Sequence, residues 1–146
     1  MRLRYEEIEV GSVYQTDTYT VTKEDIIDFA SKYDPQYFHI DETKAEESMF
    51  HGLIASGLHT MGMCWRLWVD QNVIGDDVVA GVGFDNVRFV RPVYAGDTLS
   101  VTATFTDKKE DRKPERGFVT LRLEGANQRQ ERVLDVSVTF LVKRRN

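Results

Sequence analysis

The sequence predicts an α+β domain in which a curved antiparallel β-sheet wraps around one long central helix. Apolar residues recur at helical spacing only in the first half of the chain, and one segment there, 54–70, is apolar nearly all round. In the second half, apolar and polar residues alternate. Runs of helix followed by runs of strand are typical of α+β domains. A helix that is apolar on every side must be covered by other elements.

The composition is that of a globular protein. The chain has 146 residues, which fits one domain spanning 1–146. Hydrophobic residues make up 41% of the chain and charged residues 29%, which argues against a disordered protein. The net charge of -5 argues against nucleic acid as the main partner.

The sequence favours a cytoplasmic protein over an exported or membrane-spanning one. Residues 1–9 hold acids where a signal peptide needs an apolar run. The segment 52–69 carries one fixed charge, Arg66, but polar residues interrupt it, so a buried helix is a better interpretation than a membrane span. The single cysteine, Cys64, excludes an intrachain disulfide and is expected to be a buried, inert thiol.

The first elements are a strand and a helix. Residues 13–21 alternate weakly and predict a strand. Thr22 to Asp25 then has the form of a helix start, and four apolar or aromatic residues follow at helical spacing: Ile26, Phe29, Ala30 and Tyr33. Pro35 ends this helix because the residue before a proline avoids helical angles. Asp34 is therefore expected at the helix exit.

Two more helices are predicted before the sheet. Residues 42–48 indicate a short surface helix, and 54–70 form the long buried one. Within the long helix, one set of residues steps by four and three positions and is expected to share a face: Ile54, Leu58, Met61, Trp65 and Trp68.

The rest of the chain predicts antiparallel strands. They are expected at 78–84 and 87–90, separated by a bulge at 85–86, and at 99–106, 119–123 and 134–142. The charged segment 108–116 is expected to be a solvated hairpin loop; the alternative is contact with the phosphates of a ligand.

An acid and a base lie close together in the sequence, at Asp34 and His39. Histidine exchanges protons near neutral pH, and a carboxylate can hold a water and accept its proton. A turn could bring both side chains to one point, with Tyr37 and Phe38 anchoring it. Alternatively, Asp34 caps a turn and His39 is a structural residue.

A second group of residues stands at the start of the long helix. Ala55, Ser56 and Gly57 are small, and backbone N–H groups there lack intrahelical partners and could hold a carbonyl oxygen as it gains negative charge. Gly57 could equally serve close packing. The histidines at 39, 51 and 59 do not have metal-site spacing, so no metal is expected.

Three stretches carry a family resemblance: D-P-Q-Y-F-H-I-D at 34–41, F-H-G-L-I-A-S-G-L-H-T at 50–60, and V-R-F-V-R-P-V-Y-A-G-D-T-L at 87–99. In order and spacing they resemble the MaoC-like dehydratases, relatives of the (R)-specific enoyl-CoA hydratases. The resemblance implies a hot-dog fold and a homodimer with the active site near the subunit interface. It also implies that Asp34 and His39 are the catalytic pair, and that an acyl-CoA or acyl-carrier-protein substrate enters a tunnel beside the helix.

The chain departs from the family's best-described motif, D-x-N-P-x-H. Here Pro35 directly follows Asp34, and Tyr37 occupies the later proline position. The Asp–His spacing is kept, so the expected reaction is reversible hydration of a trans-2-enoyl thioester to an (R)-3-hydroxyacyl thioester.

In the expected reaction, Asp34 takes the proton of water and His39 protonates C2, or the two roles are reversed. Ser56 and Gly57 hold the thioester carbonyl, Tyr37 and Phe38 line the pocket, and no metal or redox cofactor takes part. The alternatives are a thioesterase on the same fold and a non-catalytic acyl-binding domain.

Overall fold

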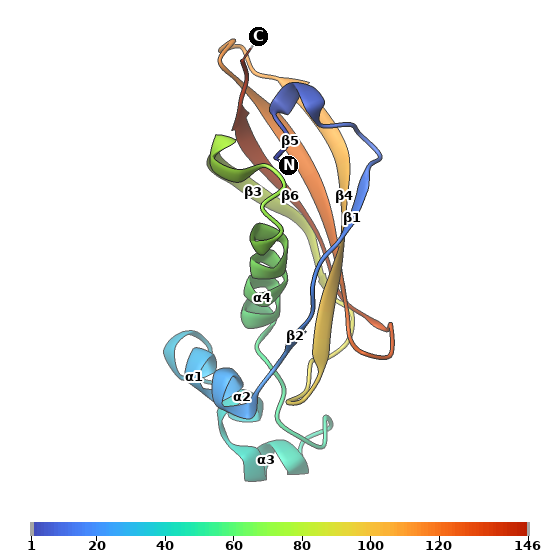
Figure 1. The fold of residues 1–146 in the computed structure, drawn as a ribbon. Helices are drawn as coiled ribbons and strands as arrows, with labels where there is room; N and C mark the ends of the chain where they lie inside the picture. Colours follow the sequence, from blue (N-terminus) through green and yellow to red (C-terminus); the bar gives the residue numbers. More distant parts are fainter. Residues whose placement is uncertain (1, 146) are drawn as a thin grey trace.

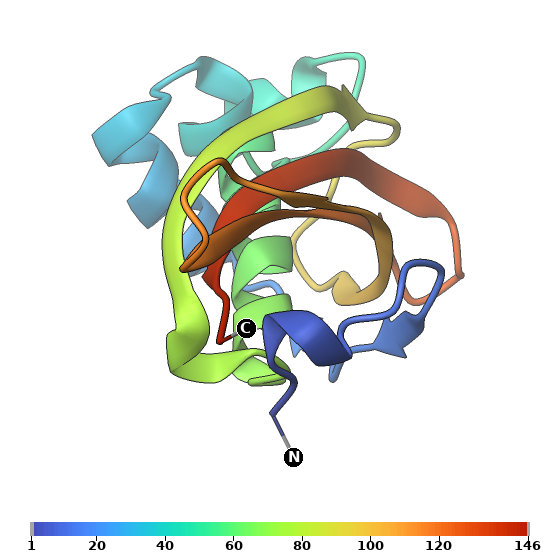
Figure 2. The same cartoon turned by 90° about the horizontal axis from the view of Figure 1, so that it is seen from above.

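The structure, a computed structural model, describes residues 2–145 and is built on an antiparallel sheet with strand order β1-β4-β5-β6-β3. The strands are β1 (Val13–Gln15), β2 (Tyr19–Thr20), β3 (Val78–Phe89), β4 (Thr98–Glu110), β5 (Arg116–Ala126) and β6 (Arg132–Lys143). β2 also pairs with β4. The sheet curves around a central helix, α4 (Gly57–Asp70), as Figures 1 and 2 show. This is the predicted α+β architecture.

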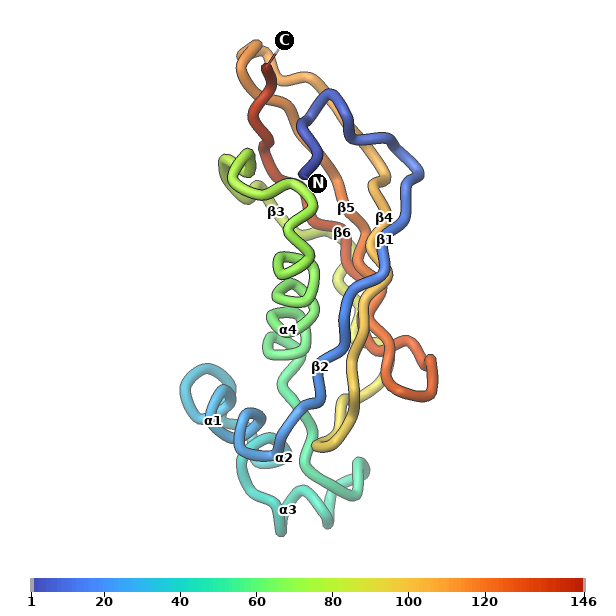
Figure 3. The backbone as a smooth tube through the Cα atoms, in the orientation of Figure 1, coloured from blue at the N-terminus to red at the C-terminus, as the bar shows by residue number. Residues whose placement is uncertain are grey.

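The smaller helices gather at one end of the molecule. They are α1 (Lys23–Tyr33), α2 (Tyr37–Ile40) and α3 (Glu42–Glu47), and the chain passes from β2 into this group and out of it into α4 (Figure 3). Two 3-10 turns, η1 (Tyr5–Glu7) and η2 (Gly75–Asp77), lie toward the opposite end, where both termini are found (Figure 1). No helix among residues 2–145 is long and apolar enough to cross a membrane.

The first helix begins and ends where the sequence predicts. The Thr22 side chain accepts a hydrogen bond from the Asp25 N–H at 3.1 Å, which satisfies one of the free donors of the first turn. α1 ends at Tyr33, and the Asp34 N–H still donates to the Ala30 carbonyl at 2.8 Å. Asp34 is thus the helix exit residue, as expected.

The single strand predicted over 13–21 is wrong, because the chain forms two short strands instead. Thr16 interrupts the ladder between them: its hydroxyl accepts from the Val101 N–H at 2.9 Å, while its own N–H donates to the Val101 carbonyl at 3.0 Å. A side-chain oxygen thereby stands in for a backbone acceptor, and regular pairing stops until Tyr19.

The long helix begins at Gly57, three residues later than the predicted start at residue 54. The residues just before Gly57 do not join the helix because their backbone pairs with the segment that follows β3. Ile54 forms an isolated bridge with Tyr94, and the Ala55 N–H donates to the Val93 carbonyl at 2.8 Å.

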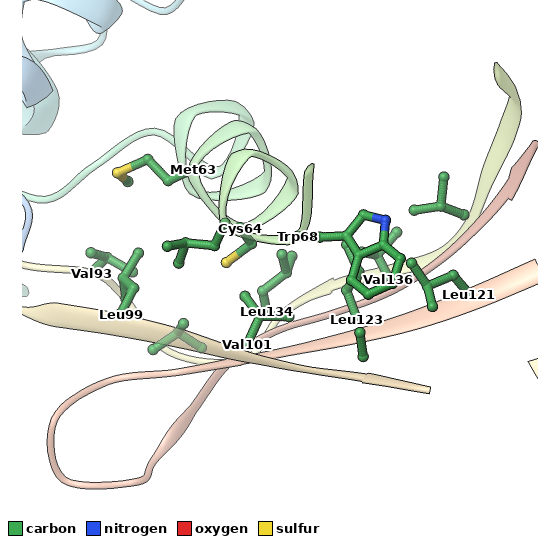
Figure 4. Close-up of a cluster of buried hydrophobic side chains, with 14 of the residues drawn as sticks. Met63, Cys64, Trp68, Val93, Leu99, Val101, Leu121, Leu123, Leu134 and Val136 are labelled. Atoms are coloured by element: carbon green, nitrogen blue, oxygen red, sulfur yellow. The ribbon is translucent and has the colours of Figure 1, made fainter. Parts of the chain in front are cut away.

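The residues predicted to share one face of this helix are not buried alike. The buried residues are Thr60, Met63, Cys64, Leu67 and Trp68, whereas Leu58 is 51% exposed. The sheet covers one side of α4, and a helix that is apolar nearly all round does not reveal which side that is. In Figure 4, Cys64 and Trp68 point toward the sheet residues Val101, Leu123 and Leu134. Cys64 is fully buried, and burial raises the pKa of its thiol to about 12, as expected for an inert cysteine.

The predicted strands of the second half are confirmed. The apolar residues of β4, β5 and β6 face the core in alternation with half-exposed polar ones. β3 is one strand with irregular register between Asp85 and Arg88, and Asn86 has a φ of 55°, so the predicted bulge is present.

The charged segment 108–116 lies far from the small helices, where β4 turns into β5 beside the two termini (Figure 1). Lys108 donates from Nζ to the carbonyls of Tyr5 and Ile8, at 3.0 and 2.9 Å. This lysine therefore ties the N-terminal turn to the sheet.

Candidate active site

Asp34 and His39 converge in space. Asp34 follows the last residue of α1, and His39 lies on α2, a one-turn helix where the sequence predicted a turn. His39 Nε2 lies 3.4 Å from Asp34 Oδ2. His39 is 4% exposed, and the Asp34 side chain is 20% exposed, so the pair is largely shielded but open on the acid's side.

The orientation of the His39 ring is set by a backbone carbonyl. His39 Nδ1 lies 2.7 Å from the Ile54 oxygen. A carbonyl oxygen can only accept, so Nδ1 carries the hydrogen and donates it. Nε2 is then the nitrogen that faces Asp34, and it carries a proton only when the ring is an imidazolium. The Phe38 ring packs against the imidazole in a T-shaped arrangement, with centroids 4.5 Å apart.

The Asp34 carboxylate accepts one hydrogen bond on each oxygen. Ser56 Oγ donates to Oδ2 at 2.7 Å, and Gln36 Nε2 donates to Oδ1 at 2.7 Å. The Ser56 bond, the Gln36 bond and the nearby His39 lower the pKa of Asp34, and partial burial opposes them. Asp34 is therefore ionised at neutral pH.

Sequence reasoning missed Gln36. The available signal was its place two residues after the acid, across a proline turn, where a long amide side chain can fold back onto the carboxylate. Ser56 was expected at the thioester carbonyl, but the structure shows a different contact for its hydroxyl. Ser56 is fully buried and precedes α4, yet its hydroxyl makes no capping bond and donates to Asp34 instead.

Gly57 is the first residue of α4, where N–H groups lack intrahelical acceptors. Its missing side chain makes room for Phe89: a Cβ at this position would lie 2.6 Å from Phe89 Cε2. The packing interpretation of this glycine is therefore supported.

A cavity of about 240 Å³ adjoins His39, whereas Asp34 is not among its lining residues. Its lining includes His39, Ile54, Ala55, Gly57, Thr60 and Phe89. Tyr37 and Phe38, expected to line the pocket, lie outside this lining: Tyr37 is 48% exposed, and Phe38 packs its ring against Phe50. The cavity thus brings His39 and the first residue of α4, Gly57, to the wall of one largely apolar space.

A larger cavity of about 550 Å³ lies beside α4, α1 and residues 17–19. Phe29, His59 and Met63 are among its lining residues. The His59 ring stacks on Phe29 with centroids 4.6 Å apart, and burial lowers the pKa of His59 while Asp25 opposes this. Within residues 2–145, no three His, Cys, Asp or Glu side chains are grouped as a metal site.

The sequence profile of the family described as "MaoC like domain" matches residues 7–127. An uncharacterised protein of Bacillus subtilis, YdeM, is 37% identical over 97% of this chain and 100% of its own length. The mesaconyl-CoA hydratase of Cereibacter sphaeroides is 34% identical over 48% of this chain, and the match covers 20% of that enzyme.

Solved structures with the same fold are numerous. The MaoC-like dehydratase from Rhodospirillum rubrum has a TM-score of 0.87 and 32% identity, over 99% of this chain and 99% of that one. An Archaeoglobus monoamine oxidase regulatory protein has a TM-score of 0.90 and 31% identity, over 99% and 97% of the two chains. The (R)-hydratase PhaJ1 from Pseudomonas aeruginosa, at 23% identity over 99% and 92% of the chains and a TM-score of 0.77, shares the hot-dog fold.

Proposed function

Because the chain belongs to the MaoC-like dehydratase family, we propose that it catalyses reversible hydration of a trans-2-enoyl thioester to an (R)-3-hydroxyacyl thioester. The observation that carries the proposal is the pairing of an ionised Asp34 with a His39 nitrogen 3.4 Å away, beside an apolar cavity. Hydration needs one group to take a proton and a second to give one.

Asp34 acts as the base in this proposal. Its lowered pKa keeps it ionised, and the Ser56 and Gln36 bonds leave each carboxylate oxygen with capacity to accept one more hydrogen bond. A water held there gives a proton to Asp34 while its oxygen bonds to C3. The electron pair of the C2–C3 double bond moves toward C2 and the thioester oxygen.

His39 acts as the acid. Because Nδ1 is committed to the Ile54 carbonyl, the proton for C2 comes from Nε2 of the imidazolium. The reverse assignment would need a protonated Asp34, which two neutral donors disfavour. After turnover Asp34 is protonated and His39 neutral, and transfer of one proton across the 3.4 Å between them restores the pair.

The thioester oxygen gains negative charge as the bond to C3 forms. The N–H of Gly57, at the positive end of α4 and on the cavity wall, is the donor proposed for it. A hydrogen bond that strengthens as charge develops lowers the barrier selectively.

The proposed substrate is an acyl group on coenzyme A or on an acyl carrier protein. The relative from Cereibacter sphaeroides is a hydratase of a CoA thioester. The proposed steps use Asp34, His39 and water, and they involve no metal or redox cofactor.

We also propose that the chain acts as a homodimer joined through β3. Among residues 2–145, this strand pairs only with β6, and it exposes large apolar side chains, among them Val82, Phe84 and Phe89 at 53%, 51% and 53%. A long, apolar, unpaired strand edge is a template for pairing with another chain. Phe89 also lines the cavity, so a second copy on β3 would stand beside the site.

The proposed hydration is tested by incubating the protein with crotonyl-CoA and longer enoyl-CoAs. Loss of the enoyl absorbance and release of free thiol are both measured. We expect loss of absorbance without thiol. Asp34→Asn and His39→Gln should each lower kcat by about 100-fold or more, since each removes one proton-transfer group.

Asp28→Asn is the matched control, because it removes an exposed carboxylate from the preceding helix. It should keep wild-type kcat. Full activity in Asp34→Asn or His39→Gln would refute the assigned role of that residue. Thiol release by the wild type would point instead to the thioesterase.

A further inference from the structure

We propose that Gln36 is a positioning residue for Asp34, holding Oδ1 of the carboxylate while Ser56 holds Oδ2, so that the acid keeps one orientation toward the substrate water. This inference depends on the proposed hydration, because that reaction gives Asp34 its role as the base. The hydrogen bond between Gln36 and Asp34 is observed in the structure and does not depend on the reaction.

The backbone of Gln36 joins the two members of the catalytic pair. Its N–H donates to the Asp34 carbonyl at 2.8 Å, and its carbonyl accepts from the His39 N–H at 3.0 Å. The side chain then turns back, so that Nε2 reaches Asp34 Oδ1 at 2.7 Å. One residue thus sets the relative position of the acid's backbone, the acid's carboxylate and the start of the helix that carries His39.

The helix does not account for a glutamine at this place. Gln36 is the N-cap of α2, a position that favours Ser, Thr, Asp and Asn. Its side chain makes no capping bond. Gln36 departs from the residue preference of the N-cap position, and its amide donates to the neighbouring acid instead. This departure indicates a role in the site.

A neutral donor suits this role. The amide stabilises the ionised carboxylate without adding a charge that would compete with His39. Each oxygen of the carboxylate accepts a hydrogen bond, so the carboxylate cannot rotate about the Cβ–Cγ bond without breaking at least one of these hydrogen bonds. A base held in this way loses little entropy when the substrate water binds.

The test compares Gln36→Leu and Gln36→Ser with the wild type. Both variants remove the amide that donates to Oδ1, but only serine is a favoured N-cap residue for α2. An effect shared by both variants therefore comes from the lost hydrogen bond to Asp34 and not from a change in helix stability. We expect the acid limb of the kcat/KM profile to move to higher pH in both variants, because Asp34 then protonates more easily. At neutral pH kcat should fall about three- to tenfold, the range of one lost hydrogen bond.

Gln15→Leu is the matched control. Gln15 also uses its side-chain amide in an exposed bond, 2.9 Å to Thr102 Oγ1, but it lies on β1 away from the site. It should leave the pH profile unchanged. If Gln36→Leu and Gln36→Ser keep the wild-type acid limb, or lower kcat/KM equally at every pH, the positioning role is refuted.

A second measurement separates this inference from the proposed function. The carboxyl carbon of Asp34 is titrated by NMR in the wild type and in Gln36→Leu, without any substrate. We expect its pKa to rise in the variant. If the pKa of Asp34 is the same in Gln36→Leu and in the wild type, the proposed hydrogen bond from Gln36 to Asp34 is refuted, whether or not the protein hydrates enoyl thioesters. A raised pKa in a protein without hydratase activity would refute the proposed function and keep the contact.

Discussion

At the scale of single residues, the site is a charged acid surrounded by neutral donors. Asp34 accepts from Ser56 and Gln36, and the nearest nitrogen of His39 lies 3.4 Å away. The direction of the pKa shift follows from these contacts, because each favours the carboxylate over the carboxylic acid. The same contacts make the stability of the protein depend on pH.

The predicted pH dependence has a definite sign. The pKa of Asp34 is lowered from 3.8 in the folded protein, so its ionisation stabilises the fold above that value. This stability is lost as the pH falls through the folded-state pKa. Ser56→Ala should therefore lower the free energy of unfolding by about 1–2 kcal/mol at pH 7 and by less at pH 3. Urea unfolding at both pH values measures the difference.

Ser48→Ala is the control for this experiment. Ser48 is also buried, but its hydroxyl donates to the neutral carbonyl of Ala45. Its loss should cost a similar free energy at both pH values. An equal cost of Ser56→Ala at pH 3 and pH 7 would contradict the coupling between Ser56 and the ionised Asp34.

At the scale of elements, one of the contacts between α4 and the sheet depends on a glycine. A Cβ on Gly125 of β5 would lie 2.7 Å from Cys64 Sγ and 3.4 Å from Leu134 Cβ. Both neighbours are fully buried, so neither has free space to move into. The glycine lets the helix approach the strand, and the thiol fills the space.

Gly125→Ala should therefore destabilise the protein by about 1–3 kcal/mol through overpacking. Cys64→Ala alone leaves a small cavity and should also destabilise it. The double variant should be more stable than the sum of the two losses predicts, because removing Sγ makes room for the new methyl group. Thermal or urea unfolding of the four proteins measures the coupling. Strictly additive losses would show that the two residues do not compete for the same space.

At the scale of the whole molecule, the described chain exposes large apolar side chains on β3 and on α4. β3 is an edge strand, exposed along its length, while the opposite side of α4 leaves Leu58 and Val69 at 51% and 49% exposure. Apolar surface on this scale marks an interaction site. The second copy proposed above would cover the part of this surface that lies on β3.

Val82→Lys, at the middle of β3, should shift the protein from dimer to monomer. A lysine on an edge strand disfavours pairing because its charge would be buried between the chains. Light scattering after gel filtration measures the mass in solution. Val13→Lys is the control, since Val13 is 56% exposed on β1, at the other edge of the sheet. A monomeric wild type, or a dimer that survives Val82→Lys, would contradict the proposed interface.

The sequence by itself determined the order of the elements, the start of α1 at Thr22, the bulge near Asn86 and the alternating strands β4, β5 and β6. It also singled out Asp34 and His39. These features depend on neighbours in the sequence: a cap three residues away, a proline that ends a helix, or a period of two.

The tertiary structure alone decided how the site is held. Ser56 meets Asp34 across 22 positions of the chain, and the Ile54 carbonyl orients the His39 ring across 15. The side of α4 that is buried, and the packing of Phe89 on Gly57, depend on where the sheet lies. Local periodicity carries no information about such contacts, because they form only when distant segments are brought together by the fold.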